Sequence, residues 1–236
     1  MTQDEQVIEA MRKLGGVATF GQLNETLDFS SWVSKTPEAS VRRIVQRTPV
    51  FYKLKPGLWG LAVMKDEIAD RLKSDSQGEN SHEHDHTYYQ GLAVEIGNYW
   101  KFDTFVPNQD KNKQFMKRQL KEVTTLPEIY DFTYNEILRF ARTVDVVWFN
   151  KRKLPHAFFE IEHTTDFSNS LLKFVELQDF HAYFYIVASE NRKRQYEDVI
   201  TRTAFESIKH RVNFADYNQL SEMYDTDPNQ MLSAVL

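Results

Sequence analysis

The sequence predicts an α/β domain that follows a smaller domain of helices and a β-hairpin. Helical and strand-like segments alternate over residues 87–225, an order that implies an α/β sheet. Three helical segments and a hairpin pattern occupy residues 1–62. Residues 63–86 separate the two regions and consist of a helix-like stretch at 65–72 followed by a polar tract. We therefore expect two domains, a flexible linker at 63–86 and a frayed tail at 226–236.

The composition is that of a globular protein, with 41% apolar and 27% charged residues. No run approaches the ~18 apolar residues of a membrane span, and no secretion signal is visible. The absence of cysteine excludes disulfides and thiol nucleophiles and suits a cytoplasmic location. The net charge of −5 weakens the case for a nucleic-acid partner without excluding it, because residues 1–62 carry 8 basic and 6 acidic side chains.

The first domain is predicted from helical spacing and turn residues. The first helix ends at Gly15-Gly16, the third begins at Thr36-Pro37, and Lys55-Pro56-Gly57 forms the turn of the hairpin. The expected helices cover 3–14, 20–27 and 36–48, and the expected strands cover 50–54 and 58–61.

Basic residues gather on the third helix and the hairpin of this domain. Arg43 and Arg47 lie one helical turn apart and share a face, which suits docking in a DNA groove. The stretch TPEASVRRIVQRTPVFYKLKPGLWGL resembles the winged helix appended to some restriction enzymes and chromatin proteins. That resemblance implies DNA contact, while a basic face used only for protein contacts is the alternative. The candidate DNA-binding residues here are Arg42, Arg43, Arg47, Lys53 and Lys55.

The second domain alternates helical and strand patterns. The expected helices cover 88–100, 111–122, 134–142, 168–180 and 192–209, and the expected strands cover 103–106, 144–149, 157–163, 182–188 and 212–214. No internal repeat is present, and no glycine-rich phosphate loop or serine-nucleophile motif occurs.

Three carboxylates stand in two otherwise apolar strands of this domain. Asp145 opens the run VDVVWF, and Glu160 and Glu162 lie two residues apart in AFFEIEH, so the glutamates share one strand face. A short hairpin joins the strands and can bring Asp145 beside Glu160. Carboxylates in buried strands are costly unless they are paired or bound to a metal. Oxygen ligands that converge in this way suit Mg²⁺, which can activate water for attack on a phosphodiester.

The order of helices and strands over residues ~87–190, with Asp145 and the Glu-x-Glu pair, resembles the restriction-endonuclease-like PD-(D/E)xK nuclease superfamily. The resemblance implies a mixed central sheet flanked by helices. It also implies that Asp145 and Glu160 are the Mg²⁺ ligands, with Mn²⁺ as a substitute. Glu162 stands where that family usually has lysine, which leaves the general base open. Some members recruit a residue from the following helix, where Lys173 and Gln178 are candidates. Glu95 resembles an extra acid that some members place on the first helix.

Two further basic segments are candidates for phosphate contact. One is the hairpin turn with Lys151, Arg152 and Lys153, and the other is the helix start with Arg192 and Arg194. His163 faces away from the glutamates and is assigned a structural role. The alternating tract at 82–86, HEHDH, is read as part of the linker rather than as a metal site.

These patterns predict a Mg²⁺-dependent endonuclease of restriction or defence type, targeted by its first domain to DNA, with double-stranded DNA expected. A homodimer is expected if both strands are cut, although no residue pattern shows it. The alternative is a non-catalytic DNA-binding regulator with a decayed nuclease-like domain, favoured by the missing motif lysine. An RNA-cutting enzyme is a third hypothesis.

Overall fold

The computed structural model describes residues 1–75, 81–163 and 166–226, apart from the side chains of residues 72–75, 81, 82 and 84. The chain forms two compact units, Met1–Glu79 and Asn80–Leu236. None of the helices within the described residues has the length and apolar character needed to span a membrane.

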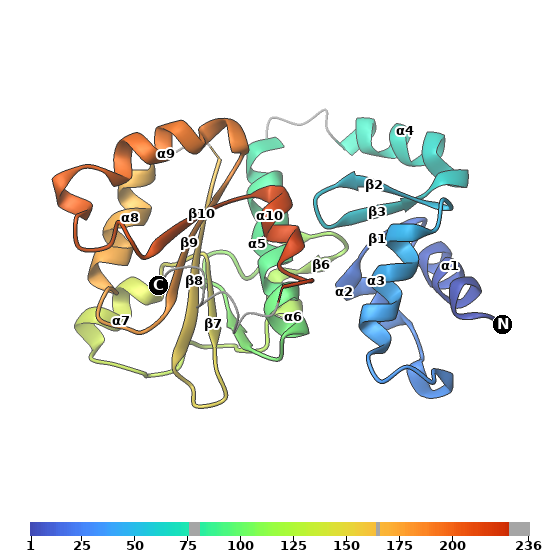
Figure 1. The fold of residues 1–236 in the computed structure, drawn as a ribbon, viewed down its shortest axis with the longest axis horizontal. Coiled ribbons are helices and arrows are strands. Elements are labelled where there is room, and N and C mark those ends of the chain that lie inside the picture. Colours follow the sequence, from blue (N-terminus) through green and yellow to red (C-terminus); the bar gives the residue numbers. More distant parts are fainter. Residues whose placement is uncertain (76–80, 164–165, 227–236) are drawn as a thin grey trace. The chain divides into compact units, whose positions relative to one another are not determined.

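Unit 1 contains the three helices and the hairpin that the sequence predicts (Figure 1). Its three-stranded antiparallel sheet has the order β1-β3-β2 and includes a strand that was not predicted, β1, paired with β3. Val7, Met11, Leu23 and Val41 are fully buried and form its core with the sheet. The elements are α1 (Gln3–Lys13), β1 (Val17–Thr19), α2 (Phe20–Thr26), α3 (Pro37–Arg47), β2 (Phe51–Lys55), β3 (Leu58–Leu61) and α4 (Lys65–Asp75).

The flexible linker predicted over 63–86 is wrong at its carboxyl end, whereas the helix-like stretch expected at 65–72 is part of α4. α5 (Ser81–Tyr99) begins seven residues before the predicted helix at 88–100. The amino-terminal part of α5 is polar, and its ordering depends on contacts to distant residues rather than on its own composition. Of the tract at 82–86, the side chains of His82 and His84 lie outside the described residues, as do residues 76–80.

Unit 2 is built on a five-stranded mixed sheet with the order β10-β9-β8-β7-β4. β4, β7 and β8 pair antiparallel, whereas β8, β9 and β10 pair parallel. The predicted α/β class and all five predicted strands are confirmed. The strands are β4 (Asp103–Phe105), β7 (Val146–Phe149), β8 (Pro155–Glu162), β9 (Tyr183–Ala188) and β10 (Val212–Asp216), and the helices of eight residues or more beside α5 are α8 (Phe167–Glu176) and α9 (Lys193–Ile200).

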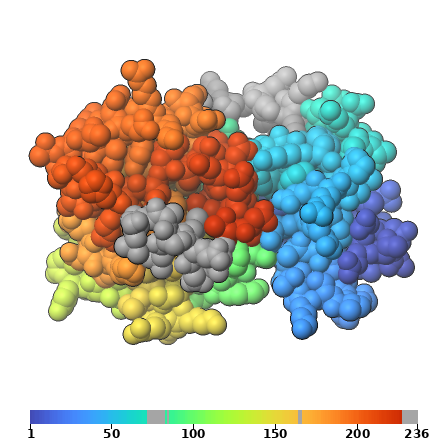
Figure 2. All heavy atoms as spheres, viewed as in Figure 1, coloured from blue at the N-terminus to red at the C-terminus, as the bar shows by residue number. Residues whose placement is uncertain are grey.

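Helices cover both faces of this sheet. α5 packs against β4, β7 and β8 on one face, with Trp148 Nε1 donating to the carbonyl of Ala93 at 3.0 Å. On the other face, α7 (Asn135–Ala141), α8 and α9 enclose an apolar core that includes Phe158, Phe174 and Phe184. In the space-filling view the carboxyl-terminal elements of unit 2, orange to red, form much of the visible surface of this unit (Figure 2). The central strands are therefore buried on both sides, as their apolar sequences indicate.

The predicted helix over 111–122 is wrong. The structure has a hairpin of β5 (Gln114–Phe115) and β6 (Arg118–Gln119), followed by α6 (Leu120–Val123). Phe115 is buried against α5, where its ring fills the space that a side chain at Gly91 would occupy. This tertiary contact overrides the local helical pattern. The last element is α10 (Tyr217–Glu222), and most of the predicted tail, residues 227–236, lies outside the described residues.

Candidate active site

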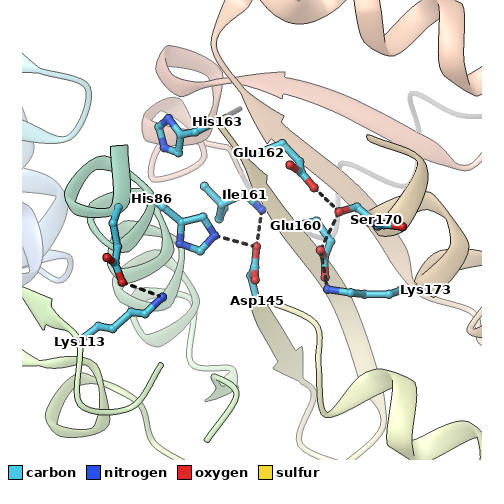
Figure 3. A pocket seen from close by; sticks show the side chains of 11 residues that line it. His86, Lys113, Asp145, Glu160, Ile161, Glu162, His163, Ser170 and Lys173 are labelled. Atoms are coloured by element: carbon cyan, nitrogen blue, oxygen red, sulfur yellow. Dashed lines mark hydrogen bonds and ion pairs between the residues drawn. The ribbon is translucent and has the colours of Figure 1, made fainter. Parts of the chain in front are cut away.

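The two glutamates lie at the carboxyl end of β8, the central strand of the sheet. Glu160 and Glu162 are only 2% and 6% exposed, and their side chains share the face covered by α8. Asp145 immediately precedes β7, which runs antiparallel to β8, so all three carboxylates meet at one edge of the sheet (Figure 3). The alternation of strand residues and the hairpin between the strands produce this convergence, as the sequence predicts.

Asp145 is held by donors from two elements. Its Oδ2 atom accepts a hydrogen bond from the backbone N–H of Ile161 at 2.7 Å and lies 3.2 Å from Nε2 of His86 on α5. Its backbone carbonyl accepts from Nε2 of Gln90 at 2.8 Å. The carboxylate is thus fixed on β8 and α5 at the same time.

Lys173 reaches Glu160 from α8. Its Nζ atom lies 2.8 Å from both carboxylate oxygens of Glu160 and 2.9 Å from the carbonyl of Thr143. The sequence places Lys173 only as a candidate on the helix after the Glu-x-Glu strand. The structure brings its ammonium group to the carboxylates, where it supplies the positive charge that position 162 lacks.

Ser170, one helical turn before Lys173, connects the two glutamates. Its hydroxyl lies 2.8 Å from Oε2 of Glu160 and also contacts Oε1 of Glu162. A hydroxyl carries one proton and can donate to only one of these oxygens.

The electrostatics of Glu160 reflect opposing effects. Burial raises the pKa of Glu160 and the neighbouring charge of Asp145 raises it further, while Lys173 and Ser170 lower it, with a net value of about 8. Burial tends to lower the pKa of Lys173, but Glu160 more than compensates, so that the pKa of this ammonium group is raised. Lys173 therefore stays charged, and Glu160 retains a proton more readily than an exposed glutamate.

The carboxylates open into a cavity of about 430 Å³ (Figure 3). Two cations face it from opposite sides, Lys173 on α8 and Lys113 on the loop before β5. Lys113 pairs with Asp110 at 2.9 Å and lies 3.6 Å from Glu83. The cavity is lined by Glu83, His86, Lys113, Asp145, Glu160, Ile161, Glu162, His163, Asn169, Ser170 and Lys173.

Comparison with known proteins supplies the family. A model of the C-terminal domain of the type II restriction enzyme NmeDI matches residues 67–235, which is more than half of the chain. The chain belongs to the NmeDI C-terminal domain family. No curated protein and no solved structure matches it.

Membership of the NmeDI family confirms the broader prediction of a restriction endonuclease, a hydrolase that acts on DNA. The match spans unit 2 up to residue 235, so it contains the whole cluster of carboxylates. It also includes residues 67–79 of unit 1, and residues 1–66 lie outside it.

Two residues that the sequence nominated lie away from the cavity of this NmeDI-family domain. Glu95 is buried with Tyr224, whose hydroxyl lies 3.3 Å from Oε2, and with Arg118 at 3.8 Å. Gln178 follows the end of α8, and its carbonyl accepts from Arg211. Neither side chain lines the cavity, because Glu95 points toward the carboxyl-terminal segment and the helix ends before Gln178.

His163 has a hydrogen-bonded position near the cavity. Its Nδ1 atom lies 2.9 Å from the hydroxyl of Tyr217, whose ring stacks on Tyr89 with a centroid distance of 3.7 Å. These contacts hold the ring of His163 in the lining of the cavity, and its structural role stays a prediction.

Sequence reasoning missed His86, Ser170 and Lys113. His86 lies in the tract assigned to the linker, because the five residues before it, 81–85, are all polar or charged. Ser170 gave a signal: it precedes Lys173 by three residues and so shares its helix face. No sequence signal marks Lys113, because the sequence predicts a helix where the structure has the hairpin that positions this residue.

The predicted DNA-contacting residues divide by exposure. Arg42 is buried at 8% exposure, which removes it from the surface of α3. Arg192 is half-buried over the ring of Phe167, at 4.3 Å from its centroid, and Lys55 is also half-buried. The exposed members are Arg43, Arg47, Lys53, Lys151, Arg152, Lys153 and Arg194.

Proposed function

We propose that the chain is a metal-dependent endonuclease that hydrolyses DNA phosphodiester bonds with Asp145, Glu160 and Lys173. The observation that carries the proposal is the meeting of these three groups at the end of the central strand, in a domain of a restriction-endonuclease family. The arrangement supports a Glu-x-Glu variant of the PD-(D/E)xK pattern in which the lysine comes from the following helix.

The donor set suits a hard divalent cation. Asp145 is close enough to Glu160 for its negative charge to raise the pKa of Glu160. A divalent cation bound by both carboxylates would relieve the repulsion between them. Within the described residues no three acidic or histidine side chains are already arranged as a complete metal site. Two carboxylates with water in the remaining positions are the usual protein contribution for Mg²⁺. A bound Mg²⁺ supplies a polarised water and neutralises charge on the phosphate.

The protein groups then divide the work of hydrolysis. A water oxygen bonds to phosphorus and gives up one proton, the P–O ester bond on the opposite side breaks, and the leaving oxygen takes up one proton, so that the products are a phosphate monoester and a hydroxyl group. Lys173 provides fixed positive charge next to the reacting phosphate, and Thr143 and Glu160 hold its ammonium group in place. Ser170 orients Glu160 through its hydroxyl and keeps Glu162 beside it.

We further propose that unit 1 is a winged helix that positions the enzyme on double-stranded DNA. The order α1-β1-α2-α3-β2-β3 and the antiparallel sheet β1-β3-β2 support this. Arg43 and Arg47 are exposed on α3, and Lys53 is exposed on β2. Cations on a helix and an adjoining hairpin provide phosphate contacts on both sides of a groove.

Cleavage assays with Asp145→Ala and Glu160→Ala test the catalytic proposal. Each variant is expected to lose at least about a hundredfold in Mg²⁺-dependent cleavage of duplex DNA while still binding that DNA. Asp179→Ala, a change of an exposed acid after α8, is the matched control and is expected to cut normally.

Cleavage by both active-site variants at the wild-type rate would overturn the assignment. A wild-type protein that binds DNA but shows no divalent-ion binding and no cleavage would favour the non-catalytic alternative. Faster cleavage of RNA than of duplex DNA would replace the proposed substrate.

A further inference from the structure

α5 contacts Asp145 at two points that are one helical turn apart. His86 lies 3.2 Å from the side-chain atom Oδ2, and Gln90 donates to the backbone carbonyl at 2.8 Å. Residues separated by four positions lie on the same face of a helix. One face of α5 therefore holds both the side chain and the backbone of Asp145.

The other contact to this carboxylate reaches the same oxygen. The N–H of Ile161 donates to Oδ2 at 2.7 Å, so Oδ2 is shared between His86 and Ile161. Among the described residues, no hydrogen bond reaches Oδ1 of Asp145. The two oxygens of the carboxylate are thus distinguished, one engaged by the protein and one left for another ligand.

The hydrogen-bonding state of His86 is consistent with a donor role. Its Nδ1 atom is buried and has no partner within the described part of the chain. A buried N–H without an acceptor is rarer than a buried acceptor without a donor. The favoured form therefore carries its proton on Nε2, which donates to Asp145, and not on Nδ1. A nitrogen that donates in this way has no lone pair for a metal.

We propose that His86, with Gln90 behind it, is a positioning residue that clamps Oδ2 of Asp145 and reserves Oδ1 for the divalent ion. The inference rests on the proposed metal-dependent function and deepens it. Ligand carboxylates are commonly oriented by hydrogen bonds of this kind, and losing such a partner costs about ten- to a hundredfold in metal affinity.

Gln90 extends the clamp into the opposite wall of the cavity. Its side-chain nitrogen also lies 2.9 Å from Oδ2 of Asp110, which in turn pairs with Lys113. The side chain of Gln90 is fully buried, so its position is fixed by packing. His86 is only half-buried and contacts the Asp145 side chain directly, so it can be substituted with less risk to folding than Gln90.

Two amide substitutions separate a clamp from a merely structural histidine. The amide nitrogen of glutamine can reach the place of Nε2, whereas that of asparagine reaches only the place of Nδ1. We expect His86→Asn to weaken Mn²⁺ binding to the full-length protein about ten- to a hundredfold, measured by titration with electron paramagnetic resonance. His86→Gln should bind Mn²⁺ nearly as tightly as the wild type. His156→Gln is the control, because His156 stacks on Phe102 and lies outside the cavity lining.

A spectroscopic measurement on the wild-type protein complements the variants and does not depend on their folding. Pulsed resonance of bound Mn²⁺ should lack the strong ¹⁴N coupling of a directly ligated imidazole. Such a coupling, if it persists in the variant His163→Gln, would overturn the clamp by making His86 a ligand. Equal Mn²⁺ affinity in His86→Asn and wild type would also overturn it, as would equal losses in the asparagine and glutamine variants.

The variant Asp145→Asn distinguishes this inference from the function on which it rests. If Mn²⁺ binding by the wild type is absent, or is unaffected by Asp145→Asn, the proposed metal site fails and the clamp fails with it. If Asp145→Asn abolishes Mn²⁺ binding but His86→Asn does not change it, the metal site stands and only the clamp is wrong.

Discussion

Nζ of Lys173 lies 2.8 Å from both carboxylate oxygens of Glu160, although 13 residues separate them in the sequence. The contact joins α8 to the central strand and places an ammonium group beside Glu160. The strand residue two positions later, Glu162, is an acid and carries no positive charge. Glu162 instead contacts Ser170. The positive charge beside Glu160 therefore comes from a helix, and β8 supplies only acids at this end.

Replacing Lys173 with methionine tests whether this ammonium group takes part in cleavage. Lys173→Met keeps much of the side-chain volume and removes the charge, so we expect the cleavage rate to fall by about 10²- to 10⁴-fold. Single-turnover cleavage of duplex DNA measures the effect. Lys209→Met is the control, because Lys209 pairs with Glu206 on the surface.

A second change asks whether the charge can be moved. Glu162 shares its strand face with Glu160, so Glu162→Lys in the Lys173→Met background returns a cation to the same carboxylates. We expect a partial recovery of about tenfold or more over the single variant. A Lys173→Met protein that cuts at the wild-type rate would instead show that the lysine only neutralises a buried acid.

The raised pKa of Glu160, about 8, predicts a loss of stability with rising pH in the metal-free protein. The unfolded chain releases this proton near the ordinary glutamate value, whereas the folded chain keeps it to about pH 8. Between these values the folded state binds more protons, so the free energy of unfolding falls as the pH rises. The contribution is complete below the unfolded pKa and is lost through the folded pKa.

Glu160→Gln removes this titration. We measure the free energy of unfolding in urea with a chelator present. Between pH 6 and pH 8 this free energy should fall by about 1–2 kcal/mol more in the wild type than in Glu160→Gln. Parallel stability curves for the two proteins would contradict the raised pKa.

The sequence predicts the carboxylate site because its signals are local. The segments VDVVWF at 144–149 and AFFEIE at 157–162 are apolar runs interrupted only by acids, and parity alone places Glu160 and Glu162 on one face. A short hairpin joins the two strands, which brings Asp145 close without long-range information.

The features that sequence reasoning missed depend on distant contacts. His86 meets Asp145 across 59 residues, and its polar surroundings give no apolar period that would mark a helix. The hairpin at Gln114–Gln119 forms because Phe115 fits against a glycine of α5. The sequence of residues 111–122 alone therefore gives no indication of that contact.

Gly91→Ala tests the hairpin packing. A Cβ atom at this position would lie 2.2 Å from the ring of Phe115, which is 1% exposed. Alanine gains up to about 1 kcal/mol in helix propensity, but overpacking a buried ring costs about 1–3 kcal/mol. We therefore expect net destabilisation in urea unfolding, relieved in the double variant Gly91→Ala/Phe115→Leu. A stabilised Gly91→Ala protein would mean that the hairpin does not pack on α5 in this way.

The arginines of α3 provide a matched test of the proposed DNA-binding unit. Arg43 and Arg47 are exposed on one face, whereas Arg42 is buried at 8% exposure on the same helix. If the exposed pair contacts phosphates, Arg43→Ala/Arg47→Ala should weaken duplex DNA binding and lower the slope of log affinity against log salt by about two. Arg42→Ala should instead lower the melting temperature and leave that slope unchanged, because a buried side chain displaces no counterions from DNA. Fluorescence anisotropy at several salt concentrations, with Mg²⁺ replaced by Ca²⁺ in all samples, measures the DNA affinity and its salt slope. Thermal unfolding measures the melting temperature. A double variant with the wild-type slope would remove α3 from the DNA interface and leave the nuclease unit to bind DNA without it.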